Sequence, residues 1–591
     1  MFKLKHHRYS KVSSVGKMMF YSSVVGVITG FGAVIFLVST HFLSVYVLSG
    51  MAGYPALEPS GEPELFHSAY HKFSPILLVS ITTFGGLLSG FLVYTFAPEA
   101  EGHGTDSAIE SYHKKDGIIK PIVPIIKIVA SVITLGSGGS GGREGPIAQI
   151  GAGFGSAFAS HLKLSKKNRR ILLLSGMGAG VGAIFHAPMA GAIFAVEVLY
   201  KEMDLESEVL IYAIIASIVA YSVFCVFFGW MPLFKTPSFH FQNPIEIISY
   251  LILSIVVSLS AIFYVKIFYG MRKLFKKIPI KPHFKPAIGG ALVGLIGVFV
   301  PDAISMGYGA LQKAMVGDLT ISALLLIAFL KIFATSFTIS SGGSAGVFGP
   351  SMVIGGALGA AVGLILHNIS PVLASEPGAF TLVGMVGFFA ACANTPFSTI
   401  IMVTEMTGNY HLIVPSLLVA SISYLIAQKH TIYEKQVKNR HMSPAHYYEF
   451  TKDILQDTKV SDIMLKRFSK VYESATLDKI YKTLSNSKDD ELVVVDMYGK
   501  FSGIITMQSI KSLLNSQGVE KLVVAMDLAS KDVITTTEDE NLHTLLQRIG
   551  FQDVNIIPVL DKTDNRKIIA IIKSKDIVEA YDKAKEKLLK S

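Results

Sequence analysis

Long apolar runs and short polar breaks alternate through most of the chain. Residues 18–48, 73–98, 247–265 and 412–428 contain no Asp, Glu, Lys or Arg. A helix needs about 20 residues to cross the hydrocarbon core of a bilayer. We therefore predict that several of these runs are membrane-spanning helices.

Glycine and proline interrupt many apolar segments, and several segments are too short to span a bilayer. Broken backbone at membrane depth is tolerated only where protein or a water-filled cavity satisfies its polar groups. The breaks therefore indicate a transport path.

Composition supports a membrane protein. Charged residues make up 16% of the 591 residues, and the hydrophobic fraction is 51%. The net charge of +10 is not gathered into a basic stripe with interleaved aromatics, so nucleic-acid binding is not predicted. Cys225 and Cys392 both lie in apolar runs, and we predict neither a disulfide framework nor a metal site.

The composition changes abruptly after Tyr433, where charged residues become frequent. We predict a membrane domain over residues 1–435 and a linker over 436–458. The order helix, strand, strand, helix then occurs twice, which predicts two α/β units at 459–517 and 523–585. Basic residues before the first apolar run favour a retained first helix and a cytoplasmic N-terminus.

An internal repeat organises the membrane domain. The stretch 138–146 ends in Gly-Pro and matches 342–350, which lies 204 positions later. Ala187-Pro188 followed by Glu197 matches Thr395-Pro396 followed by Glu405, 208 positions later. We predict an all-helical domain of two homologous halves with inverted topology, and paired Gly/Pro breaks of this kind point to a transporter's central site.

The two glycine-rich turns have the form of an anion site. A turn that feeds a helix presents backbone N–H groups and the positive end of the helix dipole. Residues 136–155 and 342–359 both fit this description. Glycines also allow close helix packing, but two such turns in register favour anion binding.

Glu144 is a carboxylate inside the first turn, and its counterpart in the second half is Phe348. An ionisable group at membrane depth is a functional hypothesis by default. Its negative charge would compete with an anion for the same amides, and protonation would remove that competition. An ion pair with Arg143 is the structural alternative, although adjacent helical residues point apart.

These motifs resemble the CLC family of chloride channels and chloride/proton antiporters. The resemblance rests on residues 142–146, 346–350 and 404–408, and the tail resembles the paired CBS domains of that family. It implies a homodimer with one anion path per subunit and a gating role for Glu144. The anion-binding positions it implies are His103, Gly104, Arg143, Glu144, Gly145, Val347, Phe348 and Tyr433.

Two departures from the family pattern concern transport. The family's Gly-Ser-Gly-Ile-Pro motif corresponds here to Gly102-His103-Gly104-Thr105-Asp106, so a histidine replaces the serine and selectivity for chloride over nitrate is open. The proton-relay position of antiporters is occupied by Val198, which cannot pass a proton. Glu197 and Glu202 are nearby and could substitute.

A third departure concerns the tail. Nucleotide-binding CBS units often carry a Gly-x-x-Thr-x-x-Asp pattern, of which the first unit keeps Thr506 and the second keeps Asp576. We expect either binding of ATP, ADP or AMP at these residues or a dimer-stabilising module without a ligand.

The sequence predicts a transporter without enzymatic activity and without a required cofactor. The favoured function is a passive chloride channel, gated by voltage or pH through Glu144 and regulated by the CBS pair. A chloride/proton antiporter is the alternative, and a nucleotide-sensing membrane protein with vestigial transport is a third possibility. We expect an inner or plasma membrane with both termini in the cytoplasm.

Overall fold

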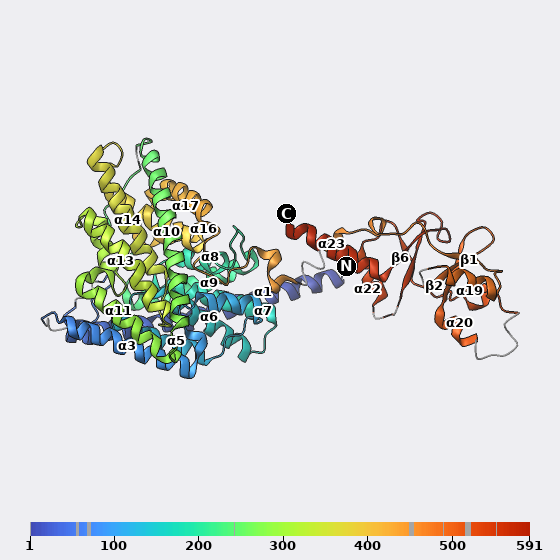
Figure 1. Cartoon of the computed structure of the whole chain (residues 1–591), viewed down its shortest axis with the longest axis horizontal. Helices are drawn as coiled ribbons and strands as arrows, with labels where there is room; N and C mark the ends of the chain where they lie inside the picture. The colour runs from blue at the N-terminus through green and yellow to red at the C-terminus, as the bar shows by residue number, and fades with distance from the viewer. Residues whose placement is uncertain are drawn as a thin grey trace. The chain divides into compact units, whose positions relative to one another are not determined.

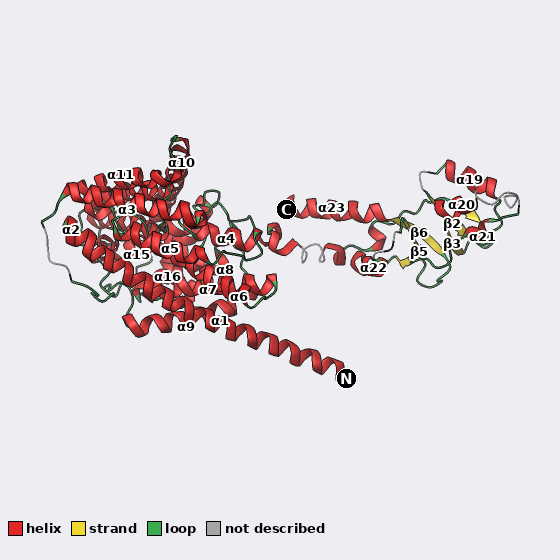
Figure 2. Cartoon of the chain, turned by 90° about the horizontal axis from the view of Figure 1, so that it is seen from below, coloured by secondary structure: helices red, strands yellow, loops and turns green. Residues whose placement is uncertain are grey.

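The structure is a computed structural model of the chain. It describes residues 2–54, 58–67, 72–241, 243–447, 454–487, 490–513, 522–550, 552 and 554–590. The chain forms two compact units, Met1–Ala445 and His446–Ser591. The first unit is helical, and the strands that the structure describes belong to the second (Figure 2).

The first unit is built of packed helices (Figure 1), and its long helices follow the apolar runs. Within the described residues, eight helical segments are long and apolar enough to cross a bilayer. They include Ser14–Ala52, Pro75–Phe96, Glu246–Lys277 and Tyr410–Ala427, which confirms the spans predicted from the uncharged runs. Shorter apolar helices also occur, as the Gly/Pro breaks predicted.

The helical elements occur in two matched series. The first half contains α3 (Pro75–Phe96), η2 (Pro98–Ala100), α4 (Thr105–Lys114), α5 (Ile122–Gly136), α6 (Glu144–His161), α7 (Lys166–Ile184), α8 (Pro188–Glu197) and α9 (Ser207–Phe228). The second contains α11 (Lys285–Phe299), η4 (Pro301–Ala303), α12 (Tyr308–Val316), α13 (Ile321–Ser340), α14 (Phe348–Ile369), α15 (Pro377–Ala393), α16 (Pro396–Thr407) and α17 (Ile413–Ala427).

Other elements flank the two series. They are α1 (Phe2–Leu43), η1 (Ser44–Ser49), α2 (Gly50–Ala52), α10 (Glu246–Lys277), η3 (Pro282–Phe284), η5 (Tyr410–Leu412), η6 (Arg440–Met442) and η7 (Pro444–His446).

Reciprocal contacts reveal a two-fold relation between the halves. The Gly142 amide donates to the Gly346 carbonyl at 2.8 Å, and the Gly346 amide returns a bond to the Gly142 carbonyl at 2.6 Å. Two hydroxyl pairs flank this bridge, and each is the repeat equivalent of the other: Ser131 with Ser344 at 2.9 Å, and Ser140 with Thr335 at 3.0 Å. The two glycine-rich turns therefore meet back to back.

Helices α8 and α16 show that the halves are inverted. Glu197 at the end of α8 accepts bonds from the Phe397 and Ser398 amides at the start of α16. Glu405 near the end of α16 accepts bonds from the Met189 and Ala190 amides at the start of α8. Each carboxylate thus satisfies the free N–H groups of the other helix, which requires the two helices to run antiparallel.

The second unit contains two similar α/β modules. In each, a short strand pairs in parallel with a central strand, which pairs antiparallel with a third. Val493, Val495 and Ile504 of the first module pack with Ile556 and Ile571 of the second in one buried cluster. The repeated order predicted from the sequence is confirmed, but the short first strands were not predicted.

The helices and strands of the second unit have the following bounds. They are η8 (Val460–Asp462), β1 (Lys470–Tyr472), α19 (Leu477–Ser485), β2 (Glu491–Val495), β3 (Phe501–Thr506), α20 (Met507–Leu513), α21 (Ala525–Leu528), β4 (Thr536–Thr537), α22 (Leu542–Ile549), β5 (Ile556–Leu560), β6 (Ile568–Lys573) and α23 (Ser574–Lys590).

Candidate anion path

Glu144 lies at the first position of α6, and Phe348 lies at the first position of α14. The Glu144 carboxylate is buried and accepts a hydrogen bond from the Gly349 amide at the start of α14. An amide at a helix N-terminus is a natural anion donor. The side chain of one half therefore occupies the amide end of the matched helix.

A small cavity lies beside this carboxylate. It has a volume of about 10 Å³, close to the space that one water-sized sphere occupies. Its polar lining comes from Thr105, Glu144 and Tyr433, and Gly145 and Phe348 also contribute. Four predicted anion-site residues, Glu144, Gly145, Phe348 and Tyr433, thus meet at one point, although they come from widely separated parts of the sequence.

Thr105 was missed in the sequence analysis. His103 was aligned with the family's serine, but the hydroxyl that lines the small cavity belongs to Thr105, two residues later. Gly104 precedes it with φ of +87°, a conformation that glycine adopts without strain. The sequence signal that could have identified Thr105 was a hydroxyl residue directly after a glycine, at the first position of a helix.

His103 lines a larger cavity and contacts Tyr433, which lines the small one. Its ring centroid is 5.3 Å from that of Tyr433, and its Nε2 is 3.3 Å from Asp106 Oδ2. The larger cavity has a volume of about 180 Å³ and is lined by His103, Gly104 and several charged residues. It opens where the chain leaves the last helix of the membrane domain, because Glu434 and Lys435 also line it.

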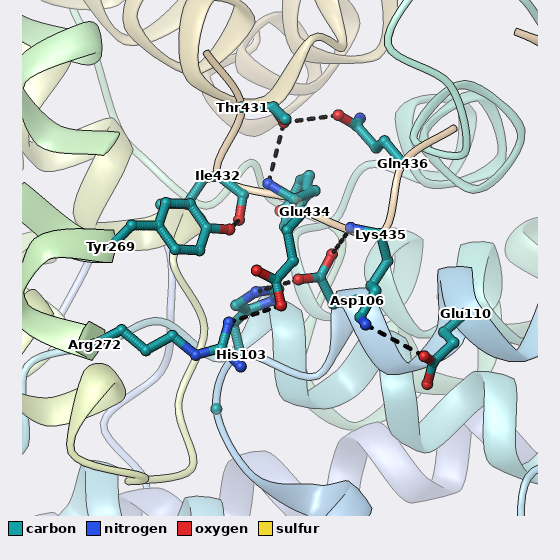
Figure 3. A network of polar contacts seen from close by, with 12 residues as sticks. His103, Asp106, Glu110, Tyr269, Arg272, Thr431, Ile432, Glu434, Lys435 and Gln436 are labelled. Carbon is teal, nitrogen blue, oxygen red and sulfur yellow. Dashed lines mark hydrogen bonds and ion pairs between the residues drawn. The ribbon is translucent and has the colours of Figure 1, made fainter. Parts of the chain in front are cut away.

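Figure 3 shows the polar network around this cavity. The Lys435 amide donates to Asp106 Oδ1 at 3.1 Å, and Arg272 pairs with Glu434 at 3.0 Å. Thr431 accepts a bond from the Tyr433 amide at 3.1 Å and thereby fixes the backbone that carries the tyrosine. The network holds the segment after α17 against the start of α4.

The Arg143 guanidinium does not line the small cavity. It is buried, pairs with Glu62 and lies 5.5 Å from the centre of the Tyr308 ring. The Glu144 carboxylate makes its bond to Gly349 instead, so the two adjacent side chains have different partners. This is the divergence expected for neighbouring positions.

A histidine between two carboxylates extends the Arg143 pair. His41 Nε2 lies 3.4 Å from Glu62, and His41 Nδ1 lies 3.3 Å from Glu58. Ligand atoms of the three residues lie within 4.8 Å of one another, a spacing that a metal ion could use. The Arg143 guanidinium already pairs with Glu62, and its positive charge disfavours a divalent cation beside that carboxylate because like charges repel. The sequence analysis missed this group, although His41 stands alone in its apolar run.

Two buried lysines hold the loops before α4 and α12. Lys127 donates to the carbonyls of Ala100 and Gly102 at 3.0 and 2.7 Å. Lys331, at the repeat-equivalent position, donates to the carbonyls of Ile304 and Ser305 at 3.2 and 2.7 Å. Each ammonium satisfies carbonyl groups that would otherwise be unpaired away from water. The two lysines lie 204 positions apart, which is the offset of the repeat, so the sequence already indicated that they are equivalent.

The predicted proton-relay position is buried and apolar. Val198 has no exposed surface, and the neighbouring Glu197 is 1% exposed. Glu197 also accepts a bond from the Ser398 hydroxyl at 2.5 Å, so its carboxylate is committed to helix α16. The Glu202 carboxylate accepts a hydrogen bond from the side-chain amide of Asn439 at 3.0 Å, in the segment that follows the last helix of the membrane domain.

The two candidate nucleotide residues make local contacts. Thr506 accepts a bond from the Ser509 amide at 3.2 Å, and Asp576 accepts one from the Lys573 amide at 3.3 Å. Each residue therefore orders the turn between the last strand of its module and the following helix.

Family comparisons agree with this architecture. The model described as voltage gated chloride channel matches residues 85–428. The chain belongs to the CLC family. The CBS domain model matches residues 460–516 and 524–583, so the family resemblance drawn from the motifs is confirmed.

Similar proteins include exchangers and a protein named as a channel. The H(+)/Cl(-) exchange transporter ClcA of Vibrio cholerae is 28% identical over 431 residues, covering 71% of this chain and 88% of ClcA. The putative chloride channel protein ClcB-like of Ralstonia nicotianae is 28% identical over 353 residues, covering 59% of this chain and 81% of the relative.

Solved structures share the fold. A slow cyanobacterial Cl-/H+ antiporter superposes with a TM-score of 0.62 at 23% identity, covering 70% of this chain and 94% of the antiporter. A eukaryotic CLC transporter superposes with a TM-score of 0.59 at 16% identity, covering 96% and 98% of the two chains.

Proposed function

We propose that the protein exchanges chloride for protons across its membrane and that Glu144 couples the two ions. The observation that carries the proposal is the bond from the Gly349 amide to the Glu144 carboxylate beside the small cavity. The exchange transporters among the relatives support it. This choice replaces the passive channel as the favoured function.

The coupling follows from competition for one helix N-terminus. Ionised Glu144 is an anion and binds the amide that chloride needs. Protonation removes the charge, weakens the charge-assisted hydrogen bond and lets chloride replace the carboxylate at the amide. Hydroxyl groups of Thr105 and Tyr433 line the same cavity and can donate to the ion. Chloride entry and proton binding therefore promote one another.

A passive chloride channel is the second candidate. Val198 favours it, because an apolar buried side chain supplies no proton path at that position. Glu197 does not replace it, since its carboxylate is engaged by the start of α16.

We also propose a homodimer. An apolar groove of about 320 Å³ runs along α16 and α17, and half-buried Glu405 lines it together with Phe397 and Ile401. A carboxylate facing lipid is costly, so a second copy of the chain is the occupant that fits. We propose one path per subunit, because residues from both halves of one chain line the small cavity together.

The tail is proposed to regulate transport in the cytoplasm, with both termini on that side of an inner or plasma membrane. Adenine nucleotides are the proposed ligands, and Thr506 and Asp576 are the proposed contacts. Calorimetry of the full-length protein with ATP, ADP and AMP tests this. Absence of heat with all three would leave a dimer-stabilising module as the function of the tail.

Vesicles decide between exchange and passive conduction. Protein reconstituted with a chloride gradient and without a proton ionophore should move protons uphill while chloride moves downhill. The Glu144→Gln variant is the control, because its side chain cannot take up a proton. Chloride flux without proton movement in the wild type would establish the channel.

A further inference from the structure

Exchange requires a path for protons to Glu144 from the side of the membrane domain where the chain continues into the tail. His103 lines the large cavity and its ring contacts Tyr433, and Tyr433 lines the small cavity beside Glu144. His103 is 5% exposed. It is thus a titratable side chain that lines one cavity and contacts a residue lining the other.

We propose that His103 transfers protons between the large cavity and Glu144, and that Asp106 orients it for this task. The proposal rests on the proposed exchange function and assigns it a route. The route runs along the anion path itself and does not pass Val198.

The hydrogen-bond pattern of His103 suits a proton carrier. Its Nε2 faces Asp106 Oδ2 at 3.3 Å, whereas its buried Nδ1 has no hydrogen-bond partner among the described residues. A carboxylate fixes the tautomer of a histidine by accepting the N–H bond. Neutral His103 therefore carries its hydrogen on Nε2 and a free lone pair on Nδ1.

The transfer balances without a co-reactant. Nδ1 takes a proton from protonated Glu144 by way of water beside Tyr433, and the ring becomes an imidazolium. The imidazolium then releases its Nε2 proton to water in the large cavity, which Nε2 faces together with Asp106. A Glu144 carboxylate and neutral His103 with its hydrogen on Nδ1 result, and the reverse sequence returns a proton to Glu144.

The charges that face His103 come from several elements. Asp106 belongs to α4, and Asp106 itself is held by the Lys435 amide at 3.1 Å. The other charged groups lining the same cavity are Glu99, Glu101, Glu110, Lys115, Arg272, Glu434 and Lys435, and Lys127 binds the Gly102 carbonyl next to His103. Arg272 is paired with Glu434, Glu110 with Lys115 and Lys435, and Glu99 with Lys120. Among the described residues, Asp106 is the carboxylate within ion-pair distance of the His103 ring.

The test measures the ratio of proton to chloride flux in vesicles for three variants. His103→Gln removes the titratable group, and we expect the ratio to fall about 100-fold, the lower end of general acid–base contributions. Asp106→Asn removes the charge that fixes the tautomer and should lower the ratio by a smaller factor. Glu110→Gln removes another carboxylate from the same cavity and should leave the ratio unchanged.

Each outcome has a distinct meaning. Wild-type protein without proton movement would refute the proposed exchange, and this route with it. Wild-type exchange with an unchanged ratio in His103→Gln would overturn the route alone. An unchanged ratio with altered chloride-over-nitrate selectivity would make His103 an anion ligand instead. If His103→Gln does not fold, His103→Asn and the Asp106→Asn ratio provide the same decision.

Discussion

The two halves of the membrane domain share a scaffold but differ in the chemistry they carry. Both have a buried lysine under the loop before a short helix, and Gly104 and Gly307 have φ of +87° and +81° in those loops. Glu197 and Glu405 perform the same capping role. The conserved parts of the repeat are those that satisfy backbone groups inside the membrane domain.

The differences fall around the small cavity. Glu144 corresponds to Phe348, and both lie at helix N-termini that face the same point. In the loops, the positions of His103 and Thr105 correspond to Met306 and Tyr308. The first half therefore supplies the titratable and small hydroxyl groups, and the second supplies the amide that binds Glu144. The residues proposed to act in transport therefore lie at positions where the two halves differ.

The largest effect is expected from Glu144→Gln. The variant cannot exchange a proton, so we expect proton movement to fall by about 100-fold or more, while chloride flux continues and loses its pH dependence. In the wild type, chloride flux should rise as pH falls, because protonation releases the Gly349 amide. Chloride efflux from vesicles across a pH series measures both. An unchanged pH profile in the variant would remove Glu144 from the gate.

Matched glycines should respond unequally to alanine. A Cβ at Gly145 would collide with the backbone carbonyl of His103, whereas one at Gly349 would meet the Tyr308 hydroxyl at 2.8 Å. Overpacking costs about 1–3 kcal/mol, and a side-chain end yields more easily than backbone. Thermal unfolding in detergent should show a larger loss for Gly145→Ala than for Gly349→Ala. Equal losses would contradict the packing difference between the two turns.

The smallest effect is expected at the capping pair. Glu197→Gln weakens bonds to the start of α16 at a fully buried site, and Glu405→Gln weakens bonds to α8 at a half-buried one. A charge at a helix N-terminus contributes about 0.3–1 kcal/mol when exposed and more when buried, so the unfolding temperature should fall further for Glu197→Gln. The proton-to-chloride ratio should not change. A lower ratio at unchanged stability would instead make Glu197 a proton carrier.

The sequence predicted those parts of the fold that a few residue types enforce. Uncharged runs predicted spans because hydrocarbon excludes charge, and Gly-Pro turns revealed the repeat because few residues can replace them. The structural similarity of the loops before α4 and α12 was not predicted, because their sequences share only a proline, an alanine and a glycine. The group formed by His41, Glu58 and Glu62 was missed because tertiary folding alone brings α1 and the following loop together.

The central claim is that an anion and the Glu144 carboxylate compete for the amide end of α14. Crystals of Glu144→Gln grown in bromide test it through anomalous diffraction. We expect a bromide peak within hydrogen-bond distance of the Gly349 amide, and no bromide at that amide in wild-type crystals where the carboxylate is bound. A variant without bromide at the Gly349 amide, or with bromide bound only away from α6 and α14, would contradict the account.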